Sequence, residues 1–272
     1  MDFRQRIKKA NRIVIKVGTS TVTYKNGNIN LERIENLVKV ISDIVNSGKE
    51  VVLVTSGAVG AGVGKLRLKE KPKDVRQQQA LAAIGQCELM HIYSKFFAEY
   101  SHIVGQILLT RDVIEDNHIK ENVYNTFELL LENGIIPIVN ENDSVSIDEI
   151  QNIAKFGDND NLSAIVSKLC NADLLIILSD IDGFYDKDPR NNEDAKLLNE
   201  VHEITEELEK AAGGAGTNFG TGGMITKLTA AKTATNSGID MVLANGEEPK
   251  IILDILNGKE IGTLFLKNRK GN

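Results

Sequence analysis

The sequence predicts an α/β protein with a doubly wound, mostly parallel central sheet that carries helices on both faces. Short apolar runs rich in valine, isoleucine and leucine alternate along the chain with segments of helical periodicity, as expected of β-α-β units. Of the 272 residues, 42% are hydrophobic, which is enough for a large buried core. Small and polar residues directly follow several of the apolar runs. That placement suits ligand binding, because open α/β sheets bind ligands beyond the carboxyl ends of their strands.

The apolar runs predict strands, because β-branched side chains pack well on a pleated surface and parallel strands are buried on both faces. The expected strands cover residues 13–17, 51–55, 103–109, 135–139, 174–179 and 240–244. A further strand-like stretch, GTLFL, begins at Gly262. The segments between these strands repeat apolar residues at helical spacing, so they predict helices over residues 31–46, 77–98, 119–132, 160–171 and 224–237.

The chain reads as one domain over residues 1–272, because no linker-like tract interrupts it. It divides loosely into an N-terminal lobe of about 1–172 and a C-terminal lobe of about 173–272, at the break between a helix and LLIILSD. A weaker break at 208–223 carries a glycine-rich loop, which we expect to close over a ligand.

Composition excludes several classes of function. The net charge is −6 and basic residues are scattered, so a nucleic-acid partner is not expected. The chain has neither a signal peptide nor an apolar run long enough to span a membrane, so we expect a cytoplasmic protein. Cys87 and Cys170 lie in helical patterns and are expected to be small buried thiols. The histidines lack metal-ligand spacing, and no protein-held metal is expected.

The first strand ends in IVIKVGTS, which places Lys16 in an otherwise apolar strand. Burying a lysine is costly unless it faces an anion, so Lys16 is a candidate anion ligand; the alternative is a side chain that extends to water from the strand end.

The second strand runs into TSGAVGAGVGK, with Gly57, Gly60, Gly62 and Gly64. We expect an anion-binding loop there, or else only a tight turn. The segment is not a Walker A loop, because Leu66 follows Lys65 and Val59 stands where the first glycine would be.

Polar clusters follow the fourth strand and open the next helix, in VNENDSVS and FGDNDNLSA. They are expected to meet in one cleft, although asparagine and aspartate also serve turns and helix caps.

Two later segments, LSDIDGFYDKDPR and GTGGMITK, place Ser179 and Asp180 after a strand and Lys227 one turn into a helix behind glycines. The second segment predicts another phosphate cradle, the alternative being an exposed helical lysine. Two lysines, two glycine-rich cradles and a carboxylate cluster indicate phosphoryl transfer from ATP, which depends on positioning and charge stabilisation.

These segments together resemble the amino-acid kinase family, and within it the branch that phosphorylates the γ-carboxylate of L-glutamate in the first step of proline synthesis. The resemblance extends over about residues 11–266 and rests on IVIKVGTS, VTSGAVGAG, GQILLTR, VNEND, GDNDNLSA, LSDIDGFYDKDPR and GTGGMITK. It implies the carbamate kinase-like fold of the family. It departs from many members in two ways: the chain stops at Asn272, where they continue into a C-terminal PUA domain, and SIDEIQNIAKF is longer than in some relatives.

The resemblance also implies roles for individual residues. Lys16 and Lys227 would contact the phosphates and the transferred phosphoryl group, with Asp160 orienting both lysines. The acceptor-binding positions would be Ser56, Asp143 and Asn159, supported by Asn140 and Asp158. The nucleotide-binding positions would be Lys16, Ser179, Asp180, Thr221, Gly222, Gly223, Met224, Ile225, Thr226 and Lys227.

The same resemblance implies the ligands and partners. L-glutamate and ATP would be the substrates, and Mg²⁺ would travel on the nucleotide phosphates with several waters. Proline would compete for the acceptor pocket as a feedback inhibitor, the next enzyme would be a glutamyl phosphate reductase, and the chain would form a homo-oligomer. Asp143 and Asp158 suit a free ammonium group, which favours glutamate over acetylglutamate or a nucleoside monophosphate. Aspartate or acetylglutamate kinase chemistry, a non-catalytic nucleotide or amino-acid sensor, and a dinucleotide-dependent oxidoreductase are the alternatives.

Overall fold

The computed structural model describes residues 3–268 except 111, 146–158, 188, 190–191 and 213–222. Within this part of the chain the strands are β1 Arg12–Val17, β2 Glu50–Val54, β3 Val104–Leu109, β4 Ile136–Glu141, β5 Leu174–Ser179, β6 Glu200–Val201, β7 Asp240–Asn245 and β8 Thr263–Phe265. The helices are α1 Arg4–Ile7, α2 Thr19–Val22, α3 Leu31–Asn46, α4 Ala58–Lys65, α5 Val75–Glu99, α6 Asp112–Glu115, α7 Asn117–Glu132, α8 Asn159–Leu169, α9 Glu206–Ala212, α10 Met224–Asn236 and α11 Ile251–Leu256.

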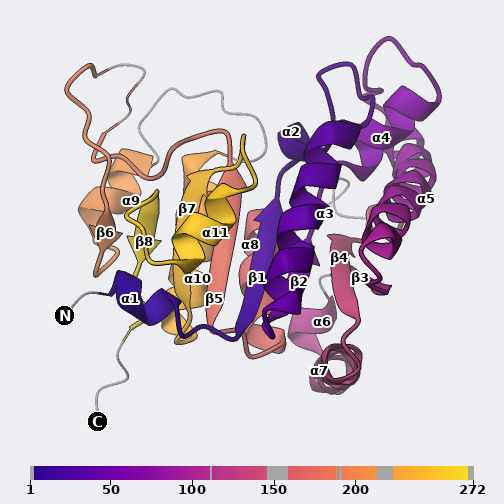
Figure 1. Cartoon of the computed structure of the whole chain (residues 1–272). Coiled ribbons are helices and arrows are strands. Elements are labelled where there is room, and N and C mark those ends of the chain that lie inside the picture. Colours follow the sequence, from indigo (N-terminus) through magenta and orange to yellow (C-terminus); the bar gives the residue numbers. More distant parts are fainter. Residues whose placement is uncertain are drawn as a thin grey trace.

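The described strands form one eight-stranded sheet in the order β3-β4-β2-β1-β5-β7-β8-β6 (Figure 1). Every pair is parallel except β7 and β8, which are antiparallel. The predicted doubly wound, mostly parallel sheet is confirmed, and each predicted strand and helix lies within about two residues of its expected position. Strand β6 and the short helices were not predicted from the sequence. None of the described helices is both long and apolar enough to cross a bilayer.

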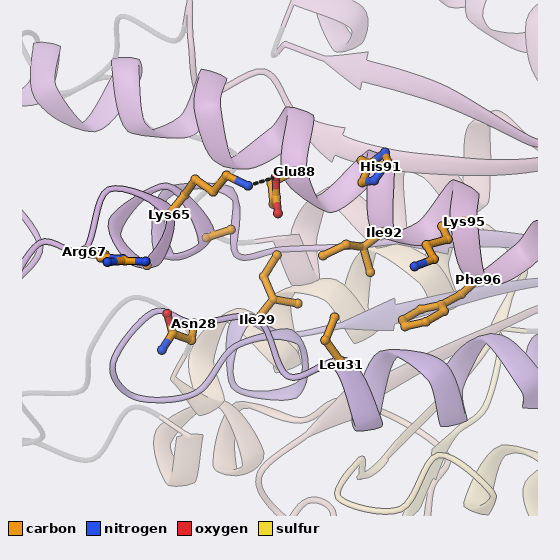
Figure 2. A pocket seen from close by; sticks show the side chains of 12 residues that line it. Asn28, Ile29, Leu31, Lys65, Arg67, Glu88, His91, Ile92, Lys95 and Phe96 are labelled. Carbon is orange, nitrogen blue, oxygen red and sulfur yellow. Dashed lines mark ion pairs between the residues drawn. The ribbon is translucent and has the colours of Figure 1, made fainter.

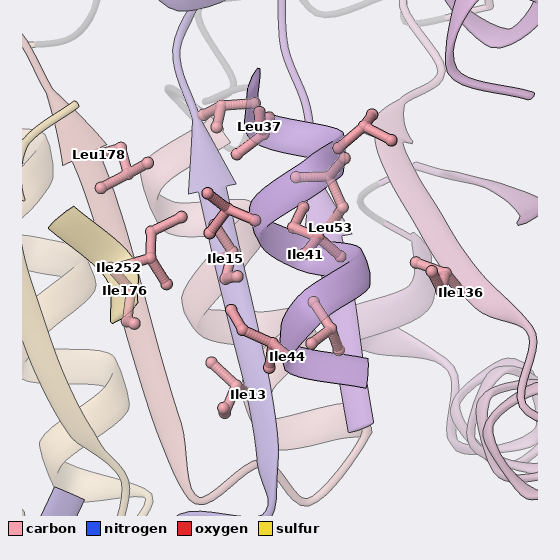
Figure 3. Packing of buried hydrophobic residues seen from close by; sticks show 14 of the residues in the cluster. Ile13, Ile15, Leu37, Ile41, Ile44, Leu53, Ile136, Ile176, Leu178 and Ile252 are labelled. Atoms are coloured by element: carbon pink, nitrogen blue, oxygen red, sulfur yellow. The ribbon is translucent and has the colours of Figure 1, made fainter. Parts of the chain in front are cut away.

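The alternation of side chains along β1 separates the two faces of the sheet. Ile13 and Ile15 belong to one buried cluster, which they share with Ile41 of α3 and Ile252 of α11 (Figure 3). Val14 belongs to the other cluster, with residues of α7, α8 and α10. Since successive strand residues point to opposite faces, Lys16 lies on the same face as Val14. The strand period therefore points Lys16 toward the helices α8 and α10.

Capping side chains begin three of the long helices. Asn30, Asp74 and Asp116 each accept a hydrogen bond from a backbone N–H in the first turn of α3, α5 and α7, at 3.1, 3.0 and 2.7 Å. Such caps satisfy N–H groups that have no partner within the helix. Asparagine and aspartate therefore serve as ordinary helix caps in this protein, and neither residue type by itself indicates a site.

The prediction that a glycine-rich loop follows β2 is wrong for most of its residues. Gly57 is the turn residue, with a φ of 94°, but residues 58–65 form helix α4. A Cβ atom on Gly62 would lie 2.1 Å from the carbonyl oxygen of Leu81 in α5, and one on Gly85 of α5 would lie 1.8 Å from that of Ala58. These glycines allow α4 and α5 to pack with their backbones almost in contact.

One expectation about the thiols is also wrong. Cys170 is buried, as expected, but Cys87 is exposed. Helical periodicity places a residue on a face of its helix, while the packing of neighbouring elements decides whether that face is covered.

Candidate active site

A buried carboxylate between two ammonium groups forms the centre of the candidate site. Nζ of Lys16 lies 2.6 Å from Oδ1 of Asp160, and Nζ of Lys227 lies 3.1 Å from Oδ2. The Asp160 residue is fully buried, and the two lysines are 5% and 6% exposed. The lysine at the end of β1 and the one in the first turn of α10 are thus both buried against an anion, and neither reaches out to water.

The charge state of this cluster follows from competing effects on Asp160. Burial by itself would raise the pKa of its carboxyl group, because the charged form loses its hydration. The ammonium groups of Lys16 and Lys227 outweigh burial through charge attraction and hydrogen bonds, so the pKa lies below its usual value. The group is therefore a carboxylate at neutral pH. It offsets the repulsion between two cations held close together.

Helix starts bring the members of this cluster together. Asp160 lies in the first turn of α8, and Lys227 and Thr226 lie in the first turn of α10. Oγ1 of Thr226 lies 2.8 Å from the carbonyl oxygen of Gly223 and 3.1 Å from Oδ2 of Asp160. The two helices pack side by side on the face of the sheet to which Lys16 points. The N-terminus of α10 adds positive dipole to the same region, which favours an anion there.

A second polar cluster lies at the ends of β2 and β4 and contains the expected acceptor-binding residues. Nδ2 of Asn159 lies 2.7 Å from Oγ of Ser56, 3.0 Å from Oδ1 of Asn140 and 2.8 Å from the carbonyl oxygen of Thr55. Ser56 and Asn140 are both buried. Because Asn159 and Asp160 are consecutive in α8, this polar cluster and the lysine cluster are joined directly.

Asp143 lies just beyond β4, in the wall of a cavity of about 390 Å³ that is also lined by Ala58, Ala82, Gln86 and Met90. It is close in sequence to Asn140, but the hydrogen bonds described above do not include it. Asp158, the remaining expected acceptor residue, lies outside the described residues, as do Thr221 and Gly222.

Of the expected nucleotide-binding residues that the structure describes, Ser179 and Asp180 lie at the end of β5, Gly223 to Lys227 lie at the start of α10, and Lys16 lies on β1. Oγ of Ser179 donates to Oδ1 of Asp180 at 3.0 Å, and Nδ2 of Asn245 donates to Oδ1 of Asp182 at 2.9 Å. Gly223 is the N-cap residue of α10, whose first residues are Met224 and Ile225. Ile225 is 56% exposed, so its side chain is open to a ligand or to solvent.

Two residues that contact the site, Gln86 and Tyr93, were not predicted from the sequence. Gln86 and Tyr93, on α5, hold Asn140 and Thr55 through side-chain hydrogen bonds of 2.8 and 2.9 Å. Both lie in a regular helical pattern far from any glycine-rich or acidic motif, and no local signal in the sequence distinguishes them from ordinary core residues.

Another cavity, of about 650 Å³, lies away from these clusters, between residues 28–31, α4 and α5 (Figure 2). Lys65 and Glu88 form an ion pair of 2.8 Å at its rim. None of the residues that line it belongs to the lysine cluster or to the expected acceptor and nucleotide positions. The described residues also contain no group of three or more histidine, cysteine, aspartate or glutamate side chains that could hold a metal ion.

A sequence profile of the amino acid kinase family matches residues 11–245. The chain belongs to the amino acid kinase family. Among curated relatives in this family, glutamate 5-kinase of Clostridium perfringens is 70% identical over 98% of this chain and 99% of its own length. Glutamate 5-kinases of Listeria monocytogenes and Enterococcus faecalis are 57% and 55% identical, each over at least 97% of both chains.

Solved structures of the amino acid kinase type share the fold at low sequence identity. A carbamate kinase from Giardia lamblia bound to AMP-PNP superposes with a TM-score of 0.68 at 18% identity, over 96% of this chain and all of that one. UMP kinase from Bacillus anthracis gives a TM-score of 0.63, also at 18% identity, over 96% and 97%. The expected carbamate kinase-like fold is thereby confirmed.

Proposed function

We propose that this chain is a glutamate 5-kinase, which transfers the γ-phosphoryl group of ATP to the γ-carboxylate of L-glutamate. A carboxylate oxygen would attack the γ-phosphorus, the bond to the bridging oxygen of ADP would break, and L-glutamyl 5-phosphate would form. The observation that carries this proposal is the pair of buried ammonium groups on one buried carboxylate, Lys16 and Lys227 on Asp160. Identity of 70% to a glutamate 5-kinase over nearly the full length supports the choice of acceptor.

The lysine cluster suits the electrostatics of phosphoryl transfer. Negative charge moves onto the bridging and terminal oxygens as the phosphoryl group passes between donor and acceptor. Lys16 and Lys227 come from different elements, and each is held by its ion pair with Asp160. Charged groups fixed in this way can stabilise that charge with little reorganisation. In this proposal the part of the chain before about residue 172 binds the acceptor, and the part after it binds the nucleotide.

The acceptor needs no general base. The γ-carboxyl group of glutamate has a pKa near 4.3, so it is already a nucleophilic carboxylate at neutral pH. This agrees with clusters built from asparagine, serine, aspartate and lysine. In the proposal Ser56, Asn159 and Asp143 bind glutamate, with Asp143 facing its ammonium group and Asn140 and Asp158 in support.

Magnesium would neutralise charge on the β- and γ-phosphates. Both oxygens of Asp160 contact lysines, so this carboxylate does not serve as a metal ligand in the described arrangement. An ion carried by the phosphates and by water suits such a donor set, because Mg²⁺ dehydrates reluctantly and commonly binds through nucleotide phosphates. The nucleotide positions in this proposal include Ser179, Asp180 and the start of α10, together with Thr221 and Gly222.

The deciding experiment measures ADP release with L-glutamate, N-acetyl-L-glutamate, L-aspartate and UMP as acceptors, with hydroxylamine present to trap an acyl phosphate. We expect ADP and hydroxamate to form with L-glutamate and far less with the others. Preference for another acceptor would replace glutamate in the proposal. Nucleotide binding without acceptor-dependent ADP release would favour a sensor.

Regulation and partners extend the same proposal. Proline carries the α-carboxylate and ammonium of glutamate, so it should compete for the acceptor pocket and raise the apparent KM for glutamate. An acyl phosphate is labile, and its consumption by a reductase of glutamyl phosphate is the expected next step, in the cytoplasm. A homo-oligomer is expected and is tested by light scattering. No effect of millimolar proline on KM or turnover would remove feedback from the proposal.

A further inference from the structure

Three side-chain amides form a hydrogen-bonded chain from helix α5 to the acceptor cluster. Nδ2 of Asn140 lies 2.8 Å from Oε1 of Gln86, and Nδ2 of Asn159 lies 3.0 Å from Oδ1 of Asn140. The three residues come from α5, β4 and α8, so these hydrogen bonds join three separate elements. Gln86 lies at the end away from the lysine cluster.

Two backbone groups identify the oxygen and the nitrogen of each asparagine amide. The N–H of Glu141, which can only donate, lies 2.9 Å from Oδ1 of Asn140. The carbonyl oxygen of Thr55, which can only accept, lies 2.8 Å from Nδ2 of Asn159. With both ends determined, Asn140 must turn its amino group toward Gln86, and Gln86 must offer its oxygen.

The orientation of the Asn159 amide decides whether the Ser56 hydroxyl donates or accepts the hydrogen bond between them. Oγ of Ser56 lies 2.7 Å from Nδ2 of Asn159, so the hydroxyl group accepts that bond and keeps its own hydrogen for another acceptor. A carboxylate of the bound amino acid would be such an acceptor. If the Asn159 amide were turned over, its oxygen would face Ser56 and would take the hydroxyl hydrogen instead.

The hydrogen bond from Asn140 to Gln86 leaves a buried amide donor of Gln86 without a partner among the described residues. Gln86 is only 8% exposed, and its Nε2 has no hydrogen-bond partner among the residues that the structure describes. A buried amide donor without a partner is unfavourable, and an apolar side chain of the same size would fill the space without that loss. The oxygen that faces Asn140 is therefore the feature of Gln86 that needs an explanation beyond packing.

We propose that Gln86 is a positioning residue for the acceptor, which holds Asn140, and through it Asn159, so that Ser56 presents its hydroxyl hydrogen to a carboxylate of the substrate. Gln86 does not touch the substrate in this proposal. The inference rests on the proposed glutamate kinase activity and names a determinant of how the same site recognises its acceptor.

The test replaces Gln86 with methionine, which has a similar volume and no acceptor oxygen for Asn140. We expect the KM for glutamate to rise about tenfold, with the KM for ATP unchanged and kcat within about threefold of wild type. Gln86→Ala removes the same amide but leaves a cavity. It is the second variant if Gln86→Met does not fold, with the same expected split. Phe97→Leu, a substitution of a core residue on the same helix, should lower the melting temperature without changing either KM.

A double-mutant cycle with Ser56→Ala tests whether the effect passes through the serine. In the Ser56→Ala background Gln86→Met should raise the KM for glutamate less than threefold, because the hydroxyl that it orients is already gone. Multiplicative effects of the two substitutions, or an unchanged KM in Gln86→Met, would overturn the inference. Wild-type enzyme is assayed in parallel to separate failure of the proposed function from failure of the role of Gln86. If wild type shows no glutamate-dependent ADP release, the proposed function is wrong. If wild type is active and the KM of Gln86→Met is unchanged, only the role of Gln86 is wrong.

Discussion

Lys16 Nζ lies 2.6 Å from Oδ1 of Asp160, which joins the first strand of the sheet to a helix far along the chain. The carboxylate has no exposed surface, and its second oxygen contacts Lys227. A carboxylate shared in this way holds two cations at fixed positions near one anion site.

Removing either lysine should lower turnover strongly. We expect Lys16→Ala and Lys227→Ala each to reduce kcat at least 10²-fold, or about 2.7 kcal/mol or more, as loss of one preorganised donor to a developing oxyanion does elsewhere. Lys232→Ala is the matched control, because Lys232 lies on the same helix as Lys227 but is exposed and paired with Glu209. Saturating kinetics of ADP release measure the effect. A Lys227→Ala enzyme within tenfold of wild type in kcat would remove that residue from the catalytic cluster.

Lys16 and Asp160 should act as one unit. Without Asp160 the ammonium group of Lys16 has lost its counter-ion and its fixed position, so a further loss of Lys16 should matter less. The double variant Lys16→Ala/Asp160→Ala should therefore lose much less kcat than the product of the two single losses. Multiplicative losses in the same assay would mean that the two side chains act independently.

Asp143 should affect binding of the acceptor and not the chemical step. Asp143→Ala is expected to raise the KM for glutamate well beyond any fall in kcat, because it removes an interaction present in both ground and transition states. The KM for ATP should change little. Asp180→Ala, at the end of β5, should show the reverse pattern, with a higher KM for ATP and an unchanged KM for glutamate. Equal effects of Asp143→Ala on both substrates would contradict a role specific to the acceptor.

The stability contributed by Asp160 should depend on pH in the acid range. The pKa of this group is lowered in the folded protein, so its ionised form stabilises the fold above the unfolded pKa, near 4. That contribution is lost as the pH falls through the folded pKa. The melting temperature of wild type should therefore exceed that of Asp160→Asn most clearly at pH 5–7, and the difference should shrink toward pH 3. A difference that grows as the pH falls would show that the sign is wrong.

The glycines of α4 and α5 should differ in their tolerance of a methyl group. Gly62→Ala and Gly85→Ala place a Cβ atom on the backbone of the neighbouring helix and should destabilise the protein by about 1–3 kcal/mol or more. Gly60→Ala is the matched control within α4, since its Cβ would make only ordinary contacts of 3.6 Å or more. That substitution should be neutral or stabilising by up to about 1 kcal/mol through helix propensity. Urea unfolding of the three variants tests the ranking, which similar losses at Gly60 and Gly62 would contradict.

Much of the architecture was predictable because it depends on local patterns. Continuous apolar runs predict buried parallel strands, and helical periodicity predicts the helices between them, so the sheet and its long helices follow from spacing alone. Lys16 was identifiable for a related reason: a charged residue in an apolar strand is costly unless it has a partner. The short motifs after the strands likewise pointed to residues that do meet, Asn140 with Asn159 and Asp160 with Lys227.

Other features were decided by packing between distant segments. The glycines after β2 indicated an anion-binding loop, but Gly60, Gly62 and Gly64 form part of helix α4, where the missing side chain of Gly62 allows close contact with α5. The exposure of Cys87 likewise depends on which face of α5 its neighbours cover. No pattern along the chain carries that information.

The α/β class, the order of the main elements and the residue types available for phosphoryl transfer can all be read from the amino-acid sequence, because each is expressed in spacing or composition. Only the tertiary structure placed Lys16 and Lys227 on opposite oxygens of Asp160 and brought Gln86 against Asn140. Hydrogen bonds and ion pairs require atoms within about 3 Å. Between residues so far apart in the chain, that proximity arises only when the sheet and its helices pack.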